Sequence, residues 1–137
     1  MLKIFCDGGS RGNPGPAACA YIIYDDAGNI RQKCGKYLGT ATNNEAEYWA
    51  VLEALRHPEL AEGSHLNFYL DSLLVVNQLN GLWKIKEPRL KELFLKVKEL
   101  SSSLKVFYSY IPREQNRPAD ALVNETLDAN RHSGAKR

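Results

Sequence analysis

Two aspartates end apolar runs that are typical of short strands. Asp7 closes the run 2–7, and Asp71 follows the run 66–70; each is followed directly by glycine or serine. Ligand sites of open α/β sheets lie outside the carboxyl ends of the strands. The two carboxylates are therefore candidates for a functional site at one edge of a sheet.

Two more acids lie in the first turns of predicted helices. Glu47 shares a helical stripe with apolar residues three, four, seven and eight positions later, and Asp120 shares one with Val123 and Leu127. An acid in a first turn often complements the helix dipole, and that explanation suffices for either helix alone. A carboxylate on a buried stripe costs free energy unless it has a partner, so the coincidence of four such acids favours a shared site.

The four acids, if they converge, predict a site for hard divalent cations. Carboxylates that meet at one edge of a sheet repel one another unless cations neutralise them. Donor sets made only of oxygen select Mg²⁺ or Mn²⁺. The predicted ligands are Asp7, Glu47, Asp71 and Asp120.

Glu45 is predicted to cap its helix rather than to join this site. It lies two positions before Glu47, which places it about 200° away around the helix. Thr42 and Glu45 also have the spacing of a capping box, in which each side chain accepts a bond from the other residue's backbone N–H.

These acids are held by strands and helices that follow one another in a definite order. Turn-forming segments at 8–16 and 25–29 separate the first three apolar runs, which predicts an antiparallel meander. The later strands follow helices and are expected to run parallel to the first strand. The fold class is therefore α/β, with a mixed five-stranded sheet and helices on both faces. The expected strands are 2–7, 18–24, 30–38, 66–70 and 105–111, and the expected helices are 42–56, 72–79, 87–100 and 118–129.

The composition is that of one soluble globular domain. The chain has 137 residues, 44% hydrophobic and 25% charged, and a chain of this length needs neither disulfides nor a structural metal for its core. We expect one domain over 1–131 and a flexible tail at 132–137. Cys6, Cys19 and Cys34 lack metal-site spacing and are interpreted as reduced packing thiols. Residues 1–7 do not form a basic segment followed by a long apolar stretch, and no run of about 18 apolar residues occurs, so we expect a cytoplasmic protein without membrane contact.

The net charge of +2 hides an uneven distribution. Residues 84–98 hold six Lys and Arg against two Glu, a local balance of +4. A solvated helix face explains this block on its own, and a phosphate-binding surface is the alternative.

Five segments together resemble the four motifs of type 1 ribonuclease H. They occur in the family's order and spacing and span nearly the whole chain. The resemblance implies a mixed five-stranded sheet with flanking helices and hydrolysis of the RNA strand of RNA/DNA hybrids, leaving 5′-phosphate and 3′-hydroxyl ends. The segments are DGGSRGNPGPA (7–17), TNNEAEY (42–48), LDS (70–72), PREQN (112–116) and ADALVN (119–124).

The resemblance also implies a two-metal mechanism. The four acids would hold two Mg²⁺ ions about 3.5–4 Å apart, with Mn²⁺ as a substitute. Asp7 would bridge the ions, Glu47 and Asp71 would lie beside one, and Asp120 would lie beside the other. One ion would lower the pKa of an attacking water and the other would stabilise the leaving 3′ oxygen. The expected partner is an RNA/DNA hybrid bound by a monomer that has no obligate protein partner.

A set of substrate-binding residues follows from the same resemblance. Proteins tell RNA from DNA through the 2′-hydroxyl, which asparagine amides and a closely approaching glycine backbone suit. Taken alone, the asparagines are explained by turn and helix-end chemistry. The expected residues are Gly8, Gly9, Ser10, Arg11, Asn13, Thr42, Asn43, Asn44, Trp83, Lys84, Lys86 and Arg113.

Three of these residues have competing interpretations. Thr42 resembles the family position that helps to hold a DNA-strand phosphate, although its capping role explains it fully. Trp83 either stacks on the DNA sugar-phosphate or packs in the core. Arg113 stands near the place where some relatives carry a mobile histidine; it suits phosphate binding and not proton transfer.

The chain departs from many family members by lacking a basic, Trp-rich handle. Residues 80–88 lead directly into the next helix, as in a handle-less prokaryotic or archaeal form, and the basic block 84–98 is a candidate replacement. Alternatives to a hybrid-specific endonuclease are a non-catalytic hybrid-binding module, a nuclease that also cuts double-stranded RNA, and another nuclease or strand-transfer enzyme of related fold.

Overall fold

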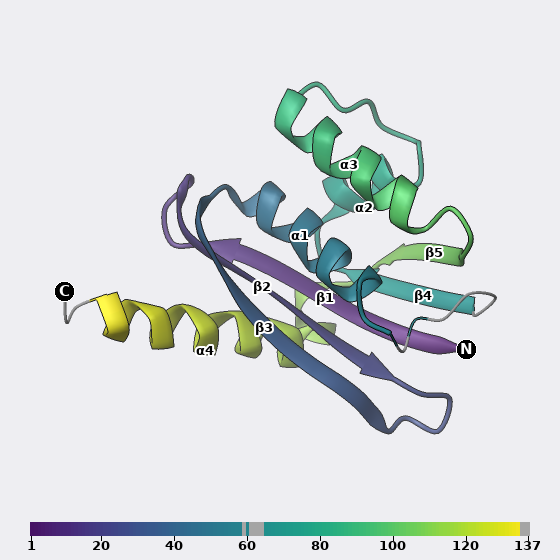
Figure 1. The fold of residues 1–137 in the computed structure, drawn as a ribbon, viewed down its shortest axis with the longest axis horizontal. Helices are drawn as coiled ribbons and strands as arrows, with labels where there is room; N and C mark the ends of the chain where they lie inside the picture. The colour runs from purple at the N-terminus through teal and green to yellow at the C-terminus, as the bar shows by residue number, and fades with distance from the viewer. Residues whose placement is uncertain (59, 61–64, 135–137) are drawn as a thin grey trace.

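The computed structural model describes residues 1–58, 60 and 65–134, and its centre is a five-stranded sheet (Figure 1). The strand order is β3-β2-β1-β4-β5, with antiparallel pairing among the first three strands of the chain and parallel pairing from β1 to β4 and from β4 to β5. This confirms the predicted mixed sheet. The strands are β1 (Leu2–Ser10), β2 (Gly15–Tyr24), β3 (Ile30–Ala41), β4 (His65–Leu70) and β5 (Lys105–Tyr110).

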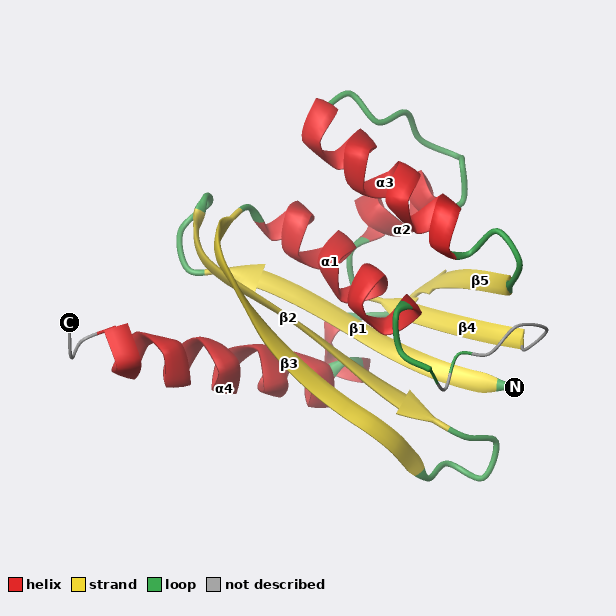
Figure 2. Ribbon diagram, in the orientation of Figure 1, coloured by secondary structure: helices red, strands yellow, loops and turns green. Residues whose placement is uncertain are grey.

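Helices cover both faces of the sheet, as predicted (Figure 2). The helices are α1 (Asn43–Leu55), α2 (Leu73–Leu79), α3 (Pro88–Leu100) and α4 (Arg117–Gly134), with a short 3₁₀ turn η1 (Arg113–Gln115) before α4. Helices α1, α2 and α3 lie on one side of the sheet and α4 lies on the other. Of the described helices, none has the length and apolar character that crossing a membrane requires.

The main core lies between the sheet and α1. Ile4 and Phe68 from the sheet and Tyr48 from α1 are fully buried, and the Tyr48 hydroxyl donates a hydrogen bond to Gln78 Oε1 of α2 at 2.7 Å. Cys6 and Cys19 are buried in this core, and Cys34 packs against it as a free thiol. Burial raises the pKa of Cys19 to about 12, which agrees with a packing role for these thiols.

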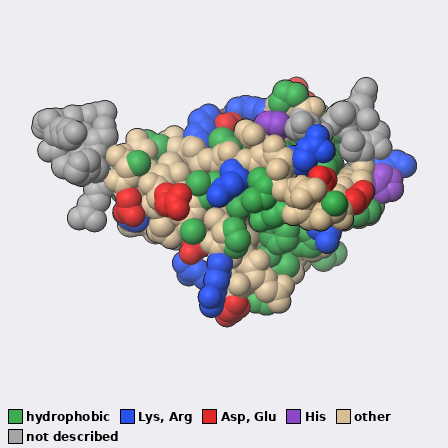
Figure 3. Space-filling model, turned by 90° about the horizontal axis from the view of Figure 1, so that it is seen from below, with side chains coloured by type: hydrophobic (Ala, Val, Ile, Leu, Met, Phe, Trp, Pro, Cys, Tyr) green, Lys and Arg blue, Asp and Glu red, His purple; other side chains and the backbone are tan. Residues whose placement is uncertain are grey.

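Helix α4 covers only part of the opposite sheet face. Figure 3 shows this face, where hydrophobic side chains are exposed to solvent beside the helix. Phe5 and Tyr69 stack there with ring centroids 4.8 Å apart, Tyr24 meets Phe5 edge-on, and Phe107 remains 54% exposed.

Strand β1 does not end at Asp7, contrary to the sequence prediction. Gly8 and Gly9 continue the antiparallel pairing, opposite Cys19 and Ala18. The glycines serve close packing here, because a Cβ at Gly8 would overlap the backbone of Ala46 in α1. The prediction that this strand ends at residue 7, which rested on the turn-forming residue types that follow, is therefore wrong.

Other boundaries also differ from the prediction. Strand β2 begins at Gly15 and not at residue 18, and strand β3 continues to Ala41 and not only to residue 38, because the two strands pair with each other from Gly15–Ala41 onwards. Helix α4 continues to Gly134 and not only to residue 129, while residues 135–137 lie outside the described part of the chain. The division into a domain over 1–131 and a tail stays a prediction.

Asp7 nevertheless lies at an opening in the sheet. The parallel pairing of β1 with β4 ends at the pair Phe5–Tyr69, and the β4 strand stops at Leu70. Asp7 is therefore beside the place where the chain after β4 turns away, which leaves room for side chains from neighbouring elements.

Candidate active site

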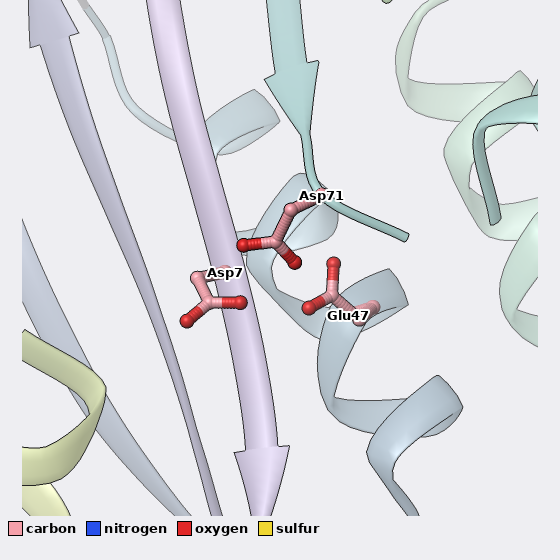
Figure 4. A group of neighbouring side chains, drawn as sticks. All are labelled: Asp7, Glu47 and Asp71. Carbon is pink, nitrogen blue, oxygen red and sulfur yellow. The ribbon is translucent and has the colours of Figure 1, made fainter. Parts of the chain in front are cut away.

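Three carboxylates from three different elements meet at this opening. Asp7 comes from β1, Glu47 from α1, and Asp71 from the loop directly after β4 (Figure 4). One oxygen from each lies within 4.8 Å of the others. The acids predicted from two strands and one helix are thus brought together.

Glu47 is fixed in this cluster by the backbone of β1. The amide N–H of Gly8 donates a hydrogen bond to Glu47 Oε1 at 3.0 Å. The other carboxylate oxygen, Oε2, is buried and has no hydrogen-bond partner among the described residues. A buried carboxylate oxygen without a donor calls for a cation, since an unpaired buried charge is costly.

The pKa shifts follow from this crowding. Burial first, and then the charges of Asp71 and Asp120, raise the pKa of Asp7 to about 7, and the neighbouring Glu47 carboxyl partly opposes this rise. Burial and the charge of Asp7 raise the pKa of Glu47 well above its usual value. Burial also raises the pKa of Asp71. Clusters of this kind bind hard divalent cations, which favour oxygen donors and the ionised acids.

Asp120 borders the same cavity from the start of α4. Its Oδ1 accepts a bond from the Arg113 guanidinium at 3.4 Å, and Arg113 is 77% exposed. The cavity has a volume of about 440 Å³ and is open to solvent. Besides the four acids, its lining includes predicted substrate-binding residues: Gly8, Gly9, Ser10, Arg11, Asn43 and Arg113.

Asparagines tie the rim of this cavity to α1. Asn43 Oδ1 accepts bonds from Ser10 N at 2.8 Å and Ser10 Oγ at 3.2 Å. Asn13 Oδ1 in turn accepts a bond from Asn43 N at 3.0 Å. These bonds hold the end of β1 against the helix start. Asn44 is half-buried, and none of the described residues hydrogen-bonds its side chain.

Glu45 has the capping role predicted for it. Thr42 Oγ1 accepts a bond from Glu45 N, and Glu45 Oε1 accepts one from Thr42 N. Its second oxygen pairs with Arg89 of α3 at 3.2 Å. These interactions hold the pKa of Glu45 below its usual value, although its partial burial opposes them.

Trp83 and Lys84 lie at a second cavity, apart from the carboxylates. This cavity, of about 430 Å³, is also lined by Lys91 of α3. Trp83 is 47% exposed, so the alternative that it packs in the core is wrong. Lys86 is exposed in the loop between α2 and α3.

One residue that touches the site was missed from the sequence. Asn116 is fully buried between η1 and α4, and its Nδ2 donates to Asp71 Oδ2 at 3.1 Å and to the carbonyl oxygen of Cys6 at 2.8 Å. Asn116 lies in the segment PREQN that carries part of the family resemblance, but it was not predicted to have a role in the site.

Comparison with known proteins gives a consistent set of relatives. A family model described as reverse transcriptase-like matches residues 5–126. The ribonuclease HI of Halobacterium salinarum is 38% identical over 128 residues, covering 93% of this chain and 64% of the relative. The bifunctional protein Rv2228c of Mycobacterium tuberculosis is 37% identical over 136 residues, covering 98% of this chain and 37% of the relative. The chain therefore spans less than two thirds of the length of these curated relatives.

A solved structure matches over almost its full length. LC11-RNase H1 in complex with an RNA/DNA hybrid is 39% identical, covers 95% of this chain and 99% of that chain, and superposes with a TM-score of 0.89. The range 5–126 that the family model matches includes Asp7, Glu47, Asp71 and Asp120.

Proposed function

The chain belongs to the type 1 ribonuclease H family, and on that premise we propose that it hydrolyses the RNA strand of RNA/DNA hybrids, leaving 5′-phosphate and 3′-hydroxyl ends. The observation that carries the proposal is the cluster of Asp7, Glu47 and Asp71 at an open cavity. A similar protein crystallised with an RNA/DNA hybrid supports the choice of substrate.

Mg²⁺ is the proposed cofactor, with two ions per site and Mn²⁺ as a substitute. Asp7, Glu47, Asp71 and Asp120 would hold the ions. The donor set consists of carboxylate oxygens. Glu47 Oε2 has no hydrogen-bond partner among the described residues, and a bound cation would supply the positive charge that it lacks. When bound, such ions lower the pKa of a water nucleophile and stabilise charge on the attacking and leaving oxygens.

The protein's own groups orient these ligands and admit the substrate. The Gly8 N–H holds Glu47 toward Asp7. Gly8 and Gly9 present backbone without side chains at the cavity wall, which lets a sugar-phosphate approach closely. Arg113 offers an exposed guanidinium beside Asp120 for a phosphate.

Cleavage assays on three duplexes test the proposal. Labelled RNA/DNA, RNA/RNA and DNA/DNA duplexes are incubated with the protein and Mg²⁺, Mn²⁺ or a chelator. We expect cutting of the hybrid RNA strand only with a divalent ion, and full inhibition by the chelator. Hybrid binding without cleavage would support a non-catalytic module, and cutting of RNA/RNA would broaden the substrate. Action as a cytoplasmic monomer without an obligate protein partner stays a prediction from the sequence.

The basic block is proposed to bind the DNA strand. Lys84 and Lys91 flank the exposed Trp83 around one cavity, and Lys86 lies nearby. Replacing all three lysines with alanine should weaken hybrid binding and flatten its salt dependence, by about 0.7–0.9 of a log-log unit for each phosphate that the lysines neutralise in the wild-type complex. Binding is measured at salt concentrations from roughly threefold below to roughly threefold above physiological ionic strength.

A matched triple variant controls for the loss of charge. Lys3, Lys33 and Lys105 are exposed on strands remote from that cavity, and their replacement with alanine removes the same charge. We expect this control to keep the wild-type salt slope. Equal slopes for the two triple variants would assign the block 84–98 to a solvated face.

Asn44 is the proposed sensor of the 2′-hydroxyl. Asn43 Oδ1 already accepts hydrogen bonds from Ser10, whereas the Asn44 side-chain amide has no hydrogen bond with the described residues. An amide both donates to and accepts from a hydroxyl, and removal of each neutral bond costs about 0.5–1.5 kcal/mol, up to roughly tenfold in rate. Asn44→Ala should slow hybrid cleavage by up to that factor without affecting metal binding.

Single deoxy replacements near the cut site provide the readout. Wild type should lose rate when the contacted ribonucleotide becomes a 2′-deoxynucleotide, and Asn44→Ala should be nearly indifferent to the same change. If both proteins respond equally to every replacement, Asn44 is only part of the helix end and the discrimination belongs to Asn13, Asn43 or the glycine backbone.

A further inference from the structure

Asn116 connects three of the elements that carry the acidic site. Its Nδ2 donates to the carbonyl oxygen of Cys6, the residue before Asp7, and also to the Asp71 carboxylate. Its own backbone carbonyl oxygen accepts a bond from Asp120 N at 3.1 Å. One fully buried residue thus touches the backbone or side chain beside Asp7, Asp71 and Asp120.

The chemistry of the two partners fixes the orientation of the amide. A backbone carbonyl and a carboxylate are both acceptors, so only the NH₂ of Asn116 can face them. The opposite oxygen, Oδ1, is buried and has no hydrogen-bond partner among the described residues. A buried acceptor without a donor costs free energy, so packing alone does not account for an amide at this position.

The contact with Asn116 restricts the rotation of the partly buried Asp71 side chain. Asp71 follows the last residue of β4 and is only partly buried. A carboxylate has two oxygens, so a hydrogen bond from Asn116 to Oδ2 leaves the other oxygen for a cation. The same amide anchors to β1, so it sets Asp71 relative to the strand that carries Asp7.

We infer that Asn116 is a positioning residue for the metal site, which holds Asp71 in its ligating orientation against β1. The inference rests on the proposed metal-dependent function. Hydrogen-bond partners of metal ligands commonly control metal affinity by about 10–100-fold. Asn116 acts through Asp71 and does not itself contact substrate or metal.

Mg²⁺ binding tests this role without requiring turnover. Asn116→Ala is compared with wild type by calorimetric titration with Mg²⁺, by the Mg²⁺ midpoint of hybrid cleavage, and by thermal unfolding in chelator. The matched control is Asn130→Ala, which also removes a bond from an asparagine amide, here on α4 to the Thr126 carbonyl oxygen, away from the site. We expect Asn116→Ala to raise the Mg²⁺ midpoint about 10–100-fold, with most of the rate recovered at saturating Mg²⁺, and Asn130→Ala to keep the wild-type midpoint.

A double-substitution cycle separates positioning from packing. In an Asp71→Asn background, adding Asn116→Ala should leave Mg²⁺ affinity nearly unchanged, because the ligand it orients is already absent. A wild-type Mg²⁺ midpoint for folded Asn116→Ala, or full additivity in the cycle, would overturn the inference. If wild type itself neither binds Mg²⁺ nor cleaves the hybrid, the proposed function fails instead.

A measurement on the wild-type protein covers the case in which the variants do not fold. With ¹⁵N-labelled asparagine, the Asn116 side-chain amide signal, assigned from its proximity to Cys6 and Asp71 protons, should shift on Mg²⁺ addition with the midpoint seen for cleavage. The Asn130 amide should stay in place. An Asn116 signal that does not respond to Mg²⁺ would also overturn the inference.

Discussion

Asp7→Asn is expected to abolish hybrid cleavage while leaving the fold intact. Asp7 lies at the centre of the cluster, and the substitution keeps its size but removes the charge that attracts a cation. Metal ions supply several kcal/mol of charge stabilisation in phosphoryl chemistry, and each 1.36 kcal/mol is a factor of ten in rate, so a loss of about a thousandfold or more is expected. Initial rates at saturating Mg²⁺ and hybrid measure it.

The same substitution should stabilise the metal-free protein, in a pH-dependent way. The folded-state pKa of Asp7 is raised from 3.8 to about 7. A raised acid pKa means that the folded state holds a proton that the unfolded state releases, so wild-type stability falls as pH rises from about 4 through 7. Asp7→Asn removes this loss. Its free energy of unfolding in chelator should exceed that of wild type at pH 8, and the difference should disappear below pH 4.

Mg²⁺ supplies the control for this stability difference. Bound cations offset the repulsion in wild type, so saturating Mg²⁺ should raise the wild-type melting temperature more than that of Asp7→Asn. Turnover by Asp7→Asn at a rate near that of wild type would contradict the assignment of Asp7. Equal metal-free stabilities at pH 8 would contradict the raised pKa alone.

The mixed sheet and the choice of acids were predictable because they rest on local patterns. Each of these patterns depends on residues close in sequence: the apolar runs, the Thr42–Glu45 capping box, and the helical stripe that Glu47 shares with the apolar residues after it. The alternation of strands and helices then determined which strands could be parallel. The clustered acids Asp7, Glu47 and Asp71 followed from their places on those elements.

What the sequence did not predict depends on contacts between distant segments. Gly8 and Gly9 have turn-forming residue types, and only the approach of α1 shows that they serve a continuous strand. Asn116 hydrogen-bonds Cys6, which lies 110 positions away in the chain. The spacing of apolar and polar residues in the sequence cannot predict such a contact. The sequence left open whether Trp83 packs in the core, because its exposure depends on how α2 and α3 pack.

Glu47→Gln and Glu45→Gln should have very different effects although both glutamates belong to the first turns of α1. Glu47 lies within the carboxylate cluster, and its Oε2 has no described hydrogen-bond partner. An amide in its place still accepts from the Gly8 N–H, so the fold should persist while a proposed metal ligand is removed. Removal of a residue that only hydrogen-bonds a metal ligand lowers metal affinity or activity by about 10–100-fold. We therefore expect removal of the ligand itself to lower the cleavage rate by more than about 100-fold.

Glu45→Gln is the matched control, with the same change of chemistry on the same helix. Its side chain caps the helix and pairs with Arg89, and the amide oxygen can still accept from Thr42 N. The loss is that of a negative charge at a helix N-terminus, about 0.3–1 kcal/mol of stability. Cleavage rates at saturating Mg²⁺ should therefore stay close to wild type for Glu45→Gln. If the two variants are equally damaged, a shared effect on α1 explains the loss and Glu47 is not singled out as a ligand; if Glu45→Gln is the worse, the wrong glutamate has been placed at the metal site.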